Sequence, residues 1–96
     1  MKLLKKAQAG SFESSDILIL IEPNEKGEGR KIDIESGVFQ QYGDKIKKLI
    51  VEMLDTYKIK DIRLKAHDKG AIDAVILARM ETVLTRGLDQ QQGTLY

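Results

Sequence analysis

The sequence predicts an α+β domain of two layers, in which a small three-stranded sheet has two helices packed on one face. Two short strand-like runs come first along the chain. An amphipathic stretch of helical period, a further alternating run and a second amphipathic stretch follow, which gives the order β-β-α-β-α. Each helix would have one apolar side, and the sheet is the surface available to cover it.

The first strand is expected at residues 17–21, where five large apolar residues follow one another. Such a run is short for a helix and is typical of a strand buried on both faces. Pro23 ends the run, and residues 24–29 make a polar turn that contains glycine. Residues 31–35 then alternate between polar and apolar, as a half-exposed strand does. Two strands with a short polar link predict a β-hairpin.

The first helix is indicated by apolar residues that recur every three or four positions between Val38 and Tyr57. Ser36 would be its N-cap. Because Gly43 is a poor helix former, the helix could instead begin at Asp44.

The third strand is expected at residues 59–66, where polarity alternates again. It could pair in parallel with the second strand through a right-handed crossover, although the strand order cannot be read from the sequence. Asp68 would cap a second helix that runs from Lys69 to Arg86, and Gly87 would close it.

Length and composition limit what the chain can do. Its 96 residues are expected to form one domain, with residues 1–14 as a flexible arm and residues 88–96 as a disordered tail. The 16 basic and 15 acidic residues nearly cancel, so no general field would hold nucleic acid or an anionic membrane. The absence of cysteine excludes disulfides and thiolate chemistry. No apolar run approaches the ~20 residues of a membrane span, and a cytoplasmic protein is expected.

Candidates for catalysis are few. His67 is the only histidine, and its neighbour Asp68 could orient it as a general base, but the sequence places no nucleophile near it. The alternative is an exposed loop histidine. Asp33 and Glu35 could bind a hard cation, or they could be the solvated face of a strand. We therefore expect no catalytic residue and no metal site.

The segment 13–16, Glu-Ser-Ser-Asp, differs from the rest in its position. It is polar, it follows the expected flexible arm, and it adjoins the most apolar strand. A serine at the edge of a rigid element is accessible to a modifying enzyme. Alternatively, Ser14 and Ser15 only satisfy backbone groups at the start of the strand. The residues alone leave both interpretations open.

Three blocks of residues are similar to short patterns of a known family. Residues 9–17, Ala-Gly-Ser-Phe-Glu-Ser-Ser-Asp-Ile, resemble its Ala-Gly-x-x-Glu-Ser-Gly-Asp pattern. Residues 41–46, Gln-Tyr-Gly-Asp-Lys-Ile, are similar to its Gln-Phe-Gly-Asp-x-Ile. Residues 68–73 and 78–81 resemble its Asp-Lys-Gly-Ala-Leu-Asp and Ala-Arg-Leu-Glu. The blocks occur in order over about residues 7–87, and together they resemble the citrate lyase acyl carrier proteins, or gamma subunits.

The resemblance implies a covalent carrier of 2′-(5″-phosphoribosyl)-3′-dephospho-CoA, which a transferase joins to Ser14 through a phosphodiester. In that family the alpha subunit exchanges the acetyl group of the carried thioester for citrate. The beta subunit then cleaves the citryl thioester, so that citrate yields acetate and oxaloacetate. The carrier itself would be non-catalytic. Ser15 stands where the pattern has glycine, so its hydroxyl could compete with that of Ser14.

Two other functions remain open. Malonate decarboxylase uses a related carrier with the same kind of prosthetic group. Alternatively, the chain is an unmodified binding module that docks through the exposed face of its sheet or through Lys45, Lys47 and Lys48 on the first helix. Docking surfaces and the stoichiometry of a complex cannot be read from the sequence.

Overall fold

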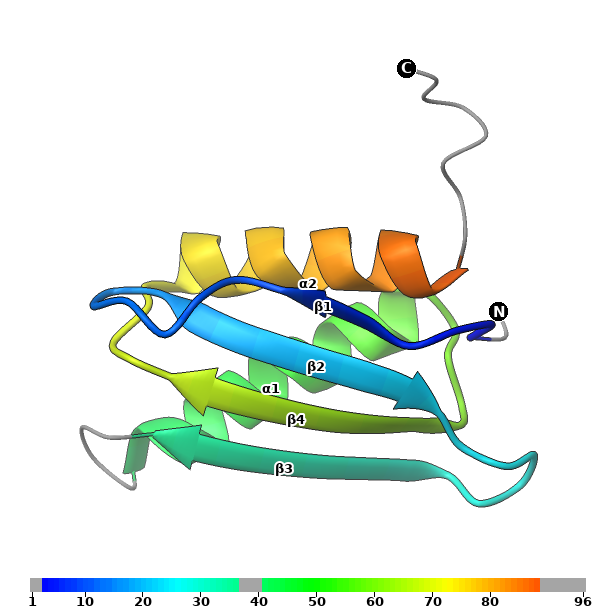
Figure 1. Cartoon of the computed structure of the whole chain (residues 1–96). Helices are drawn as coiled ribbons and strands as arrows, with labels where there is room; N and C mark the ends of the chain where they lie inside the picture. The colour runs from blue at the N-terminus through cyan, green and yellow to red at the C-terminus, as the bar shows by residue number, and fades with distance from the viewer. Residues whose placement is uncertain (1–2, 37–40, 89–96) are drawn as a thin grey trace.

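The computed structural model describes residues 3–36 and 41–88, which form a four-stranded mixed sheet and two helices. Both helices lie on the same face of the sheet (Figure 1). The prediction of three strands in the order β-β-α-β-α was therefore wrong, because one more strand precedes the others. In chain order the elements are β1 (Ala7–Ala9), β2 (Ile17–Pro23), β3 (Arg30–Ser36), α1 (Gln41–Thr56), β4 (Ile62–Asp68) and α2 (Asp73–Leu88).

The additional strand, β1, lies in the stretch that we expected to be a flexible arm. It pairs antiparallel with β2, with Ala7 opposite Ile21 and Ala9 opposite Ile19. Its three residues, Ala-Gln-Ala, are too few to produce a periodic apolar pattern. The end of α2 also holds this strand, since Arg86 donates a hydrogen bond from Nη1 to the carbonyl of Gln8 at 2.7 Å.

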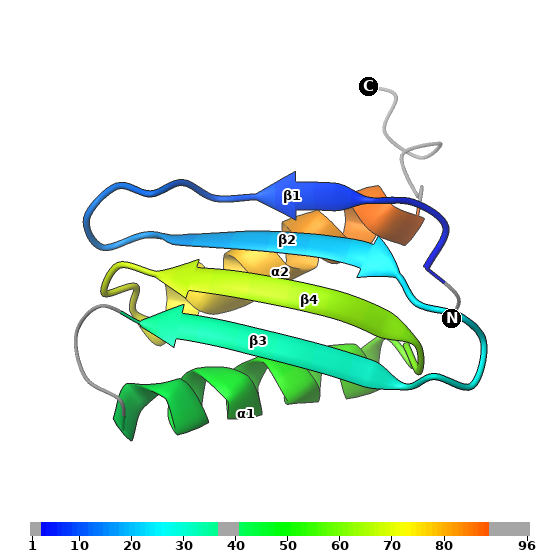
Figure 2. The same cartoon turned by 60° about the horizontal axis from the view of Figure 1, so that its bottom comes forward.

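The strand order is β1-β2-β4-β3, so β2 and β3 do not form the predicted hairpin. Strand β4 lies between them, antiparallel to β2 and parallel to β3 (Figure 2). The parallel pairing of the second and third expected strands is confirmed, and α1 is the connection between them.

The link between β2 and β3 explains why no hairpin forms. Its residues 24–29 need to cross two strand spacings, about 10 Å, which a link of this length does easily. Asp61, just before β4, accepts hydrogen bonds at Oδ1 from the backbone of Gly27 (3.1 Å) and Gly29 (2.8 Å). The amide of Ile62 donates to the carbonyl of Gly29 at 3.1 Å. The loop therefore encloses the start of β4 and leaves room for it between β2 and β3.

The core lies between the sheet and the helices. Strand β4 alternates as predicted, whereas β2 is not buried on both faces, because Leu18 and Leu20 are only half-buried on the face that no described helix covers. The side chains that fill the core from the two central strands and the helices are Ile17, Ile19, Ile21, Ile62, Leu64, Ala66, Ile46, Ile50, Leu54, Ile76, Met80, Val83, Leu84 and Leu88.

The helix termini differ from the predicted caps. Ser36 is the last residue of β3 and not an N-cap, and the expected start at Val38 lies outside the described residues. Helix α2 begins at Asp73 and not at Lys69, because Asp68 belongs to β4 and its Oδ1 accepts a hydrogen bond from the amide of Ala71 at 3.0 Å. Four residues of loop therefore separate β4 from α2.

Gly87 does not end α2 but lies buried inside its last turn. A Cβ atom there would lie 2.6 Å from Cδ1 of Leu3 and 2.8 Å from Cδ1 of Ile21, so glycine allows the N-terminal segment to pack against the helix. The expected tail is otherwise outside the described residues, which end at Leu88. Neither described helix has the length and apolar character needed to cross a membrane.

Candidate modification site

Ser14 lies in the loop of residues 10–16, which joins β1 to β2. This loop is at the end of the sheet where β3 and β4 finish and where both helices begin (Figures 1 and 2). The predicted site therefore lies beside the loop from β4 to α2, although more than 50 residues separate the two loops in the sequence.

Gly10 begins the loop in a conformation that other residues rarely adopt, with φ of +95°. A Cβ atom at this position would collide with the carbonyl oxygen of Ile17. Glycine is therefore required at this position for two reasons, the positive φ and the close approach of the backbone of β2.

Ser14 and Ser15 are the central residues of a β-turn. The amide of Asp16 donates to the carbonyl of Glu13 at 3.2 Å, which closes the turn. Ser15 has φ of 66°, whereas Ser14 is not among the described residues with positive φ. A positive φ at the third position alone is characteristic of a type II turn, which prefers glycine there. The glycine of the family pattern matches this position, and Ser15 occupies it at a conformational cost of about 1 kcal/mol.

The carboxylate of Asp16 holds this turn to α2. Arg79 donates to it from Nε and Nη2, with both distances 3.0 Å. Ser11 Oγ donates to Oδ2 at 2.6 Å, and the amide of Ile17 donates to Oδ1 at 2.7 Å. Arg79, followed by Ser11 and the Ile17 amide, stabilises the charged carboxylate and lowers the pKa of Asp16 to about 2. The same contact raises the pKa of Arg79.

Two backbone hydrogen bonds also join the loop to the segment between β4 and α2. The amide of Ser15 donates to the carbonyl of Lys69 at 2.8 Å, and the amide of Lys69 donates to the carbonyl of Asp16 at 2.9 Å. The turn is therefore fixed on both sides, with the side chain of Ser14 exposed on its outer surface.

The three serines of the loop differ in their contacts. Ser11 is engaged, since it donates to Asp16 and accepts a hydrogen bond from the amide of Glu13 at 3.2 Å. Ser14 and Ser15 are exposed, and neither hydroxyl makes a hydrogen bond to any described residue. An accessible oxygen with no protein partner to lose, on a fixed turn, fits a site of covalent attachment.

His67 and Asp68 are not brought together. They are successive residues of β4, so their side chains point to opposite faces of the sheet. His67 lies on the open face, with Nδ1 3.4 Å from Oε2 of Glu35, and its ring meets that of Phe12 edge to face at 5.5 Å. Asp68 is buried and accepts a hydrogen bond from Ser36 Oγ at 3.2 Å. The candidate general-base pair is therefore absent.

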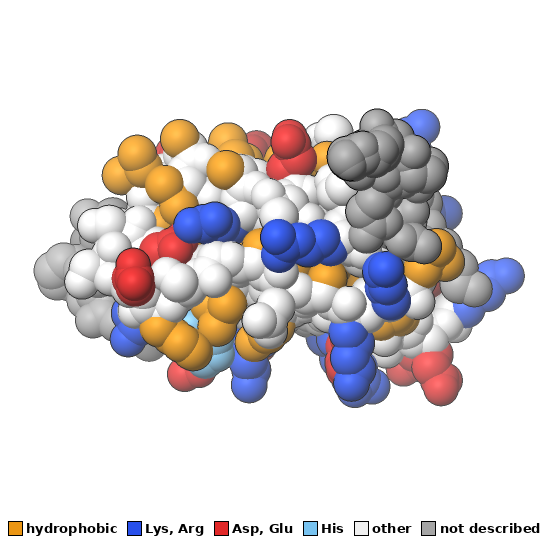
Figure 3. Space-filling model, turned by 45° about the horizontal axis from the view of Figure 1, so that its top comes forward, with side chains coloured by type: hydrophobic (Ala, Val, Ile, Leu, Met, Phe, Trp, Pro, Cys, Tyr) orange, Lys and Arg blue, Asp and Glu red, His pale blue; other side chains and the backbone are white. Residues whose placement is uncertain are grey.

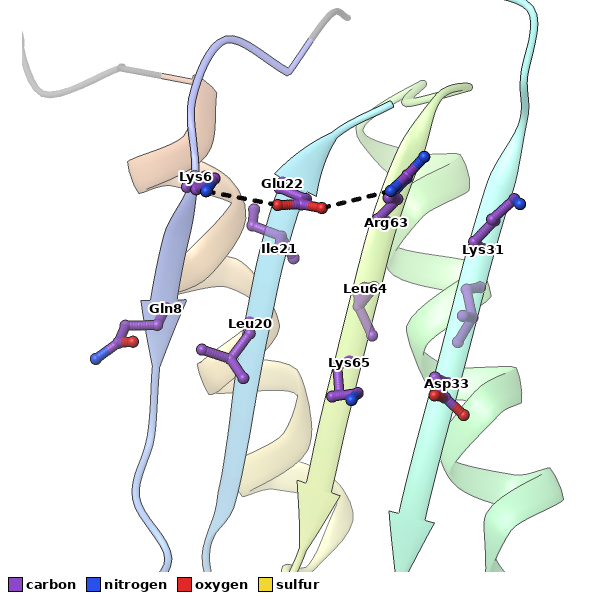
Figure 4. Close-up of a pocket in the computed structure, with 11 residues that line it drawn as sticks. Lys6, Gln8, Leu20, Ile21, Glu22, Lys31, Asp33, Arg63, Leu64 and Lys65 are labelled. Carbon is purple, nitrogen blue, oxygen red and sulfur yellow. Dashed lines mark ion pairs between the residues drawn. The ribbon is translucent and has the colours of Figure 1, made fainter. Parts of the chain in front are cut away.

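The open face of the sheet contains a shallow depression of about 750 Å³, and no residue of the serine loop lines it (Figure 4). Glu22 lies across it between Lys6 (3.8 Å) and Arg63 (3.9 Å). The depression offers no nucleophile with a base beside it. Its lining is formed by Lys6, Gln8, Leu20, Ile21, Glu22, Lys31, Ile32, Asp33, Arg63, Leu64 and Lys65.

The other candidates remain apart on the surface. Lys45, Lys47 and Lys48 are exposed on α1, and Lys45 forms an ion pair with Asp73 at 3.3 Å. Among residues 3–36 and 41–88 there is no group of three or more acidic or histidine side chains that could hold a metal ion.

The sequence reasoning missed the part that Arg79 plays. In the sequence Arg79 was only one residue of the block 78–81, but in the structure its half-exposed guanidinium holds the serine loop. The signal was present, since Asp16 and Arg79 each belong to a block that resembles the family. The residues in themselves gave no reason to pair them across 63 positions.

The fold and the site together describe a small rigid support that displays a serine, which is the arrangement of a carrier protein. The chain matches, over residues 4–87, a family model for acyl carrier proteins described as malonate decarboxylase delta subunit (MdcD). The citrate lyase acyl carrier protein of Edwardsiella ictaluri is 40% identical over 89 residues, which cover 93% of this chain and 90% of that protein. That of Lactobacillus acidophilus is 44% identical over 91 residues, covering 95% and 92%.

The chain therefore belongs to the citrate lyase acyl carrier protein family. Its relatives confirm that it is a carrier and not an enzyme in its own right. A solved structure, that of a Pseudomonas malonate decarboxylase hetero-tetramer in complex with malonate, contains a chain with the same fold. The TM-score is 0.70 at 20% identity, with 90% of this chain and 91% of that chain covered.

Proposed function

We propose that Ser14 carries 2′-(5″-phosphoribosyl)-3′-dephospho-CoA through a phosphodiester, and that the chain presents acetyl and citryl thioesters to the alpha and beta subunits of citrate lyase. Acetate and oxaloacetate would be the products of that complex. The observation that carries the proposal is the exposed hydroxyl of Ser14, which makes no hydrogen bond to a described residue and stands on a turn fixed at both sides. The curated relatives at 40% and 44% identity supply the name of the complex.

The prosthetic group would supply a thiol, which this cysteine-free chain lacks. The chain's own residues serve to hold the attachment point. Asp16 and Arg79 fix the turn to α2, and the backbone of Lys69 fixes it to the loop that follows β4. A tethered thioester is then present at high effective concentration at each partner active site. The reactions would take place in the cytoplasm, and a chain without cysteine is compatible with its reducing conditions.

Loading by the cognate prosthetic-group transferase tests the proposal. The carrier is produced together with the transferase, and its intact mass is measured. The wild-type chain should gain the mass of the group, and Ser14→Ala should not. Ser15→Ala and Ser11→Ala are the matched controls, and both should still be loaded.

Other outcomes have definite meanings. Loss of the adduct in Ser15→Ala alone would place the attachment one residue further along the turn. A wild-type chain that gains no mass beside its transferase would contradict the proposal and favour an unmodified binding module.

A carrier for malonate decarboxylase is the second candidate. The family model is described by the delta subunit of that enzyme, and the solved structure with the same fold comes from such a complex. The identities of 40% and 44% with citrate lyase carriers favour citrate lyase. The chain from the malonate decarboxylase structure is only 20% identical in sequence, so that comparison concerns the fold alone. Loaded carrier mixed with the large subunits of either enzyme separates the two, since only the correct partner should release product from citrate or malonate.

A further inference from the structure

Two large apolar side chains are exposed on the two loops that meet at the serine turn. Phe12 comes two residues before Ser14, and Ile72 lies in the loop between β4 and α2 whose Lys69 carbonyl accepts the Ser15 amide. Their exposed fractions are 61% and 67%. Figure 3 shows hydrophobic side chains at this end of the molecule in two groups, one over the start of α2 and one beside the histidine, with charged and polar atoms between them.

A single exposed apolar residue needs no explanation, since such residues are common on protein surfaces. The described residues include four large exposed apolar side chains, and two of these lie on the serine loop and on the loop hydrogen-bonded to it. The other two are Leu4, near the opposite end of α2, and Leu77, on the outer side of α2.

The ring of Phe12 and the backbone of Ile72 are both held in position, although the two side chains are exposed. The ring of Phe12 packs edge to face against His67, at an interplanar angle of 62°. The carbonyl of Ile72 accepts hydrogen bonds from the amides of Val75 (3.0 Å) and Ile76 (3.1 Å), which ties its backbone to the first turn of α2. A partner that covers them therefore loses little binding energy to ordering the Phe12 ring and the backbone that carries Ile72.

From these positions we infer that Phe12 and Ile72 form the contact surface for the transferase that esterifies Ser14. The inference rests on the proposed function of Ser14. It favours the transferase over the large subunits for a geometric reason. The transferase must bring its active site to the serine oxygen itself and so must cover the residues beside it. The large subunits act at the far end of a long arm and can leave this surface exposed.

Loading kinetics test the inference. The transferase is presented with increasing concentrations of carrier, and the initial rate of adduct formation is followed by intact mass. Phe12→Ala and Ile72→Ala should each lower kcat/KM about tenfold, mainly through a higher KM, as truncation of a central apolar contact does. Phe12→Leu, which keeps an apolar side chain, should recover most of the loss.

Leu4→Ala is the matched control, because Leu4 has the same exposed fraction as Phe12, 61%. Its amide bonds to Gly87, about 20 Å along α2 from the residues that begin the helix. The kcat/KM for loading of the Leu4→Ala carrier should stay within about twofold of the wild-type value. Urea unfolding midpoints equal to wild type would show that all the variants are folded.

Binding gives a readout independent of loading. With Ser14 replaced by alanine, the carrier cannot be consumed, and its Kd for the transferase can be measured with and without Phe12→Ala. A weaker Kd in the double variant supports the inference. Equal loading rates for Phe12→Ala, Ile72→Ala and Leu4→Ala would overturn it, as would slower use of preloaded carrier by the large subunits with normal loading. A wild-type chain that is not loaded would instead overturn the proposed function together with the inference.

Discussion

Replacing Asp16 by asparagine removes the charge that holds the serine turn to α2 while nearly preserving the shape of the side chain. In the wild-type protein both oxygens of this carboxylate face Arg79 at 3.0 Å, and 13% of the side chain is exposed. The variant keeps an oxygen for the Ile17 amide but loses the charged, two-point contact with the guanidinium. The folded state should therefore lose stability at neutral pH.

The size of the loss follows from the pKa of Asp16. That pKa is about 2 in the folded chain against a usual value of 3.8. At about 1.4 kcal/mol per pKa unit, the shift sets an upper limit near 2.5 kcal/mol. Because 41% of the Arg79 side chain is exposed to solvent, screening reduces the expected loss to about 1–1.5 kcal/mol. For a domain of this size the thermal midpoint would fall by about 5–10 °C.

The effect should also depend on pH in one direction. A carboxyl group whose pKa is lowered on folding contributes stability above its unfolded pKa and loses it as the pH falls through the folded value. The difference between wild type and Asp16→Asn should thus be constant above about pH 5 and should shrink between pH 3.8 and about pH 2.

Urea unfolding at several pH values measures this difference. Asp33→Asn is the control, because Asp33 is an exposed carboxylate on β3 without an ion pair to any described residue. It should change stability by less than about 0.5 kcal/mol. Arg79→Gln should cost about as much as Asp16→Asn, and the double variant should cost less than their sum. A loss below about 0.5 kcal/mol, or one that does not change with pH, would refute the reasoning.

Two further substitutions concern the backbone of the same loop. Gly10→Ala should destabilise the folded protein by about 3 kcal/mol or more, because the added Cβ would meet the backbone of Ile17. Gly70→Ala is the control, because Gly70 has a similar φ of +92° but an added Cβ would meet no atom within 4 Å, and it should cost about 1 kcal/mol. Equal urea midpoints for the two variants would show that the close approach at Gly10 is absent. Ser15→Gly should raise stability by about 0.5 kcal/mol, because relief of the positive φ outweighs the added freedom of the unfolded chain, and a lower thermal midpoint would contradict the assigned turn.

Several elements could be predicted from local pattern because the apolar face of each is long enough to repeat. Helix α1 and strand β4 were placed to within a few residues, since one shows a helical period and the other a strict alternation. Strand β1 could not be found in this way. Its three residues are held by pairing with β2 and by packing against α2, and neither contact leaves a periodic mark in the sequence.

The candidate site was predicted unevenly. The residues placed Ser14 on an accessible segment beside a rigid strand, and the family pattern singled it out from its neighbours. The sequence did not reveal that Ser15 has a positive φ, which explains why glycine suits that position in the family pattern. The sequence also suggested that Asp68 orients His67, because the two residues are neighbours in the chain. In a strand, however, the side chains of successive residues point to opposite faces of the sheet.

The sequence by itself determined the types of most elements, the family and the serine that we propose as the attachment point, because these depend on local periodicity and on short blocks of residues. The tertiary structure decided the order of the strands, the hold of Arg79 on Asp16 and the meeting of the serine loop with the loop before α2. The physical reason is that most of these contacts join segments more than 30 residues apart in the sequence. Their formation depends on how the sheet and helices share one core, which no local stretch of the chain specifies.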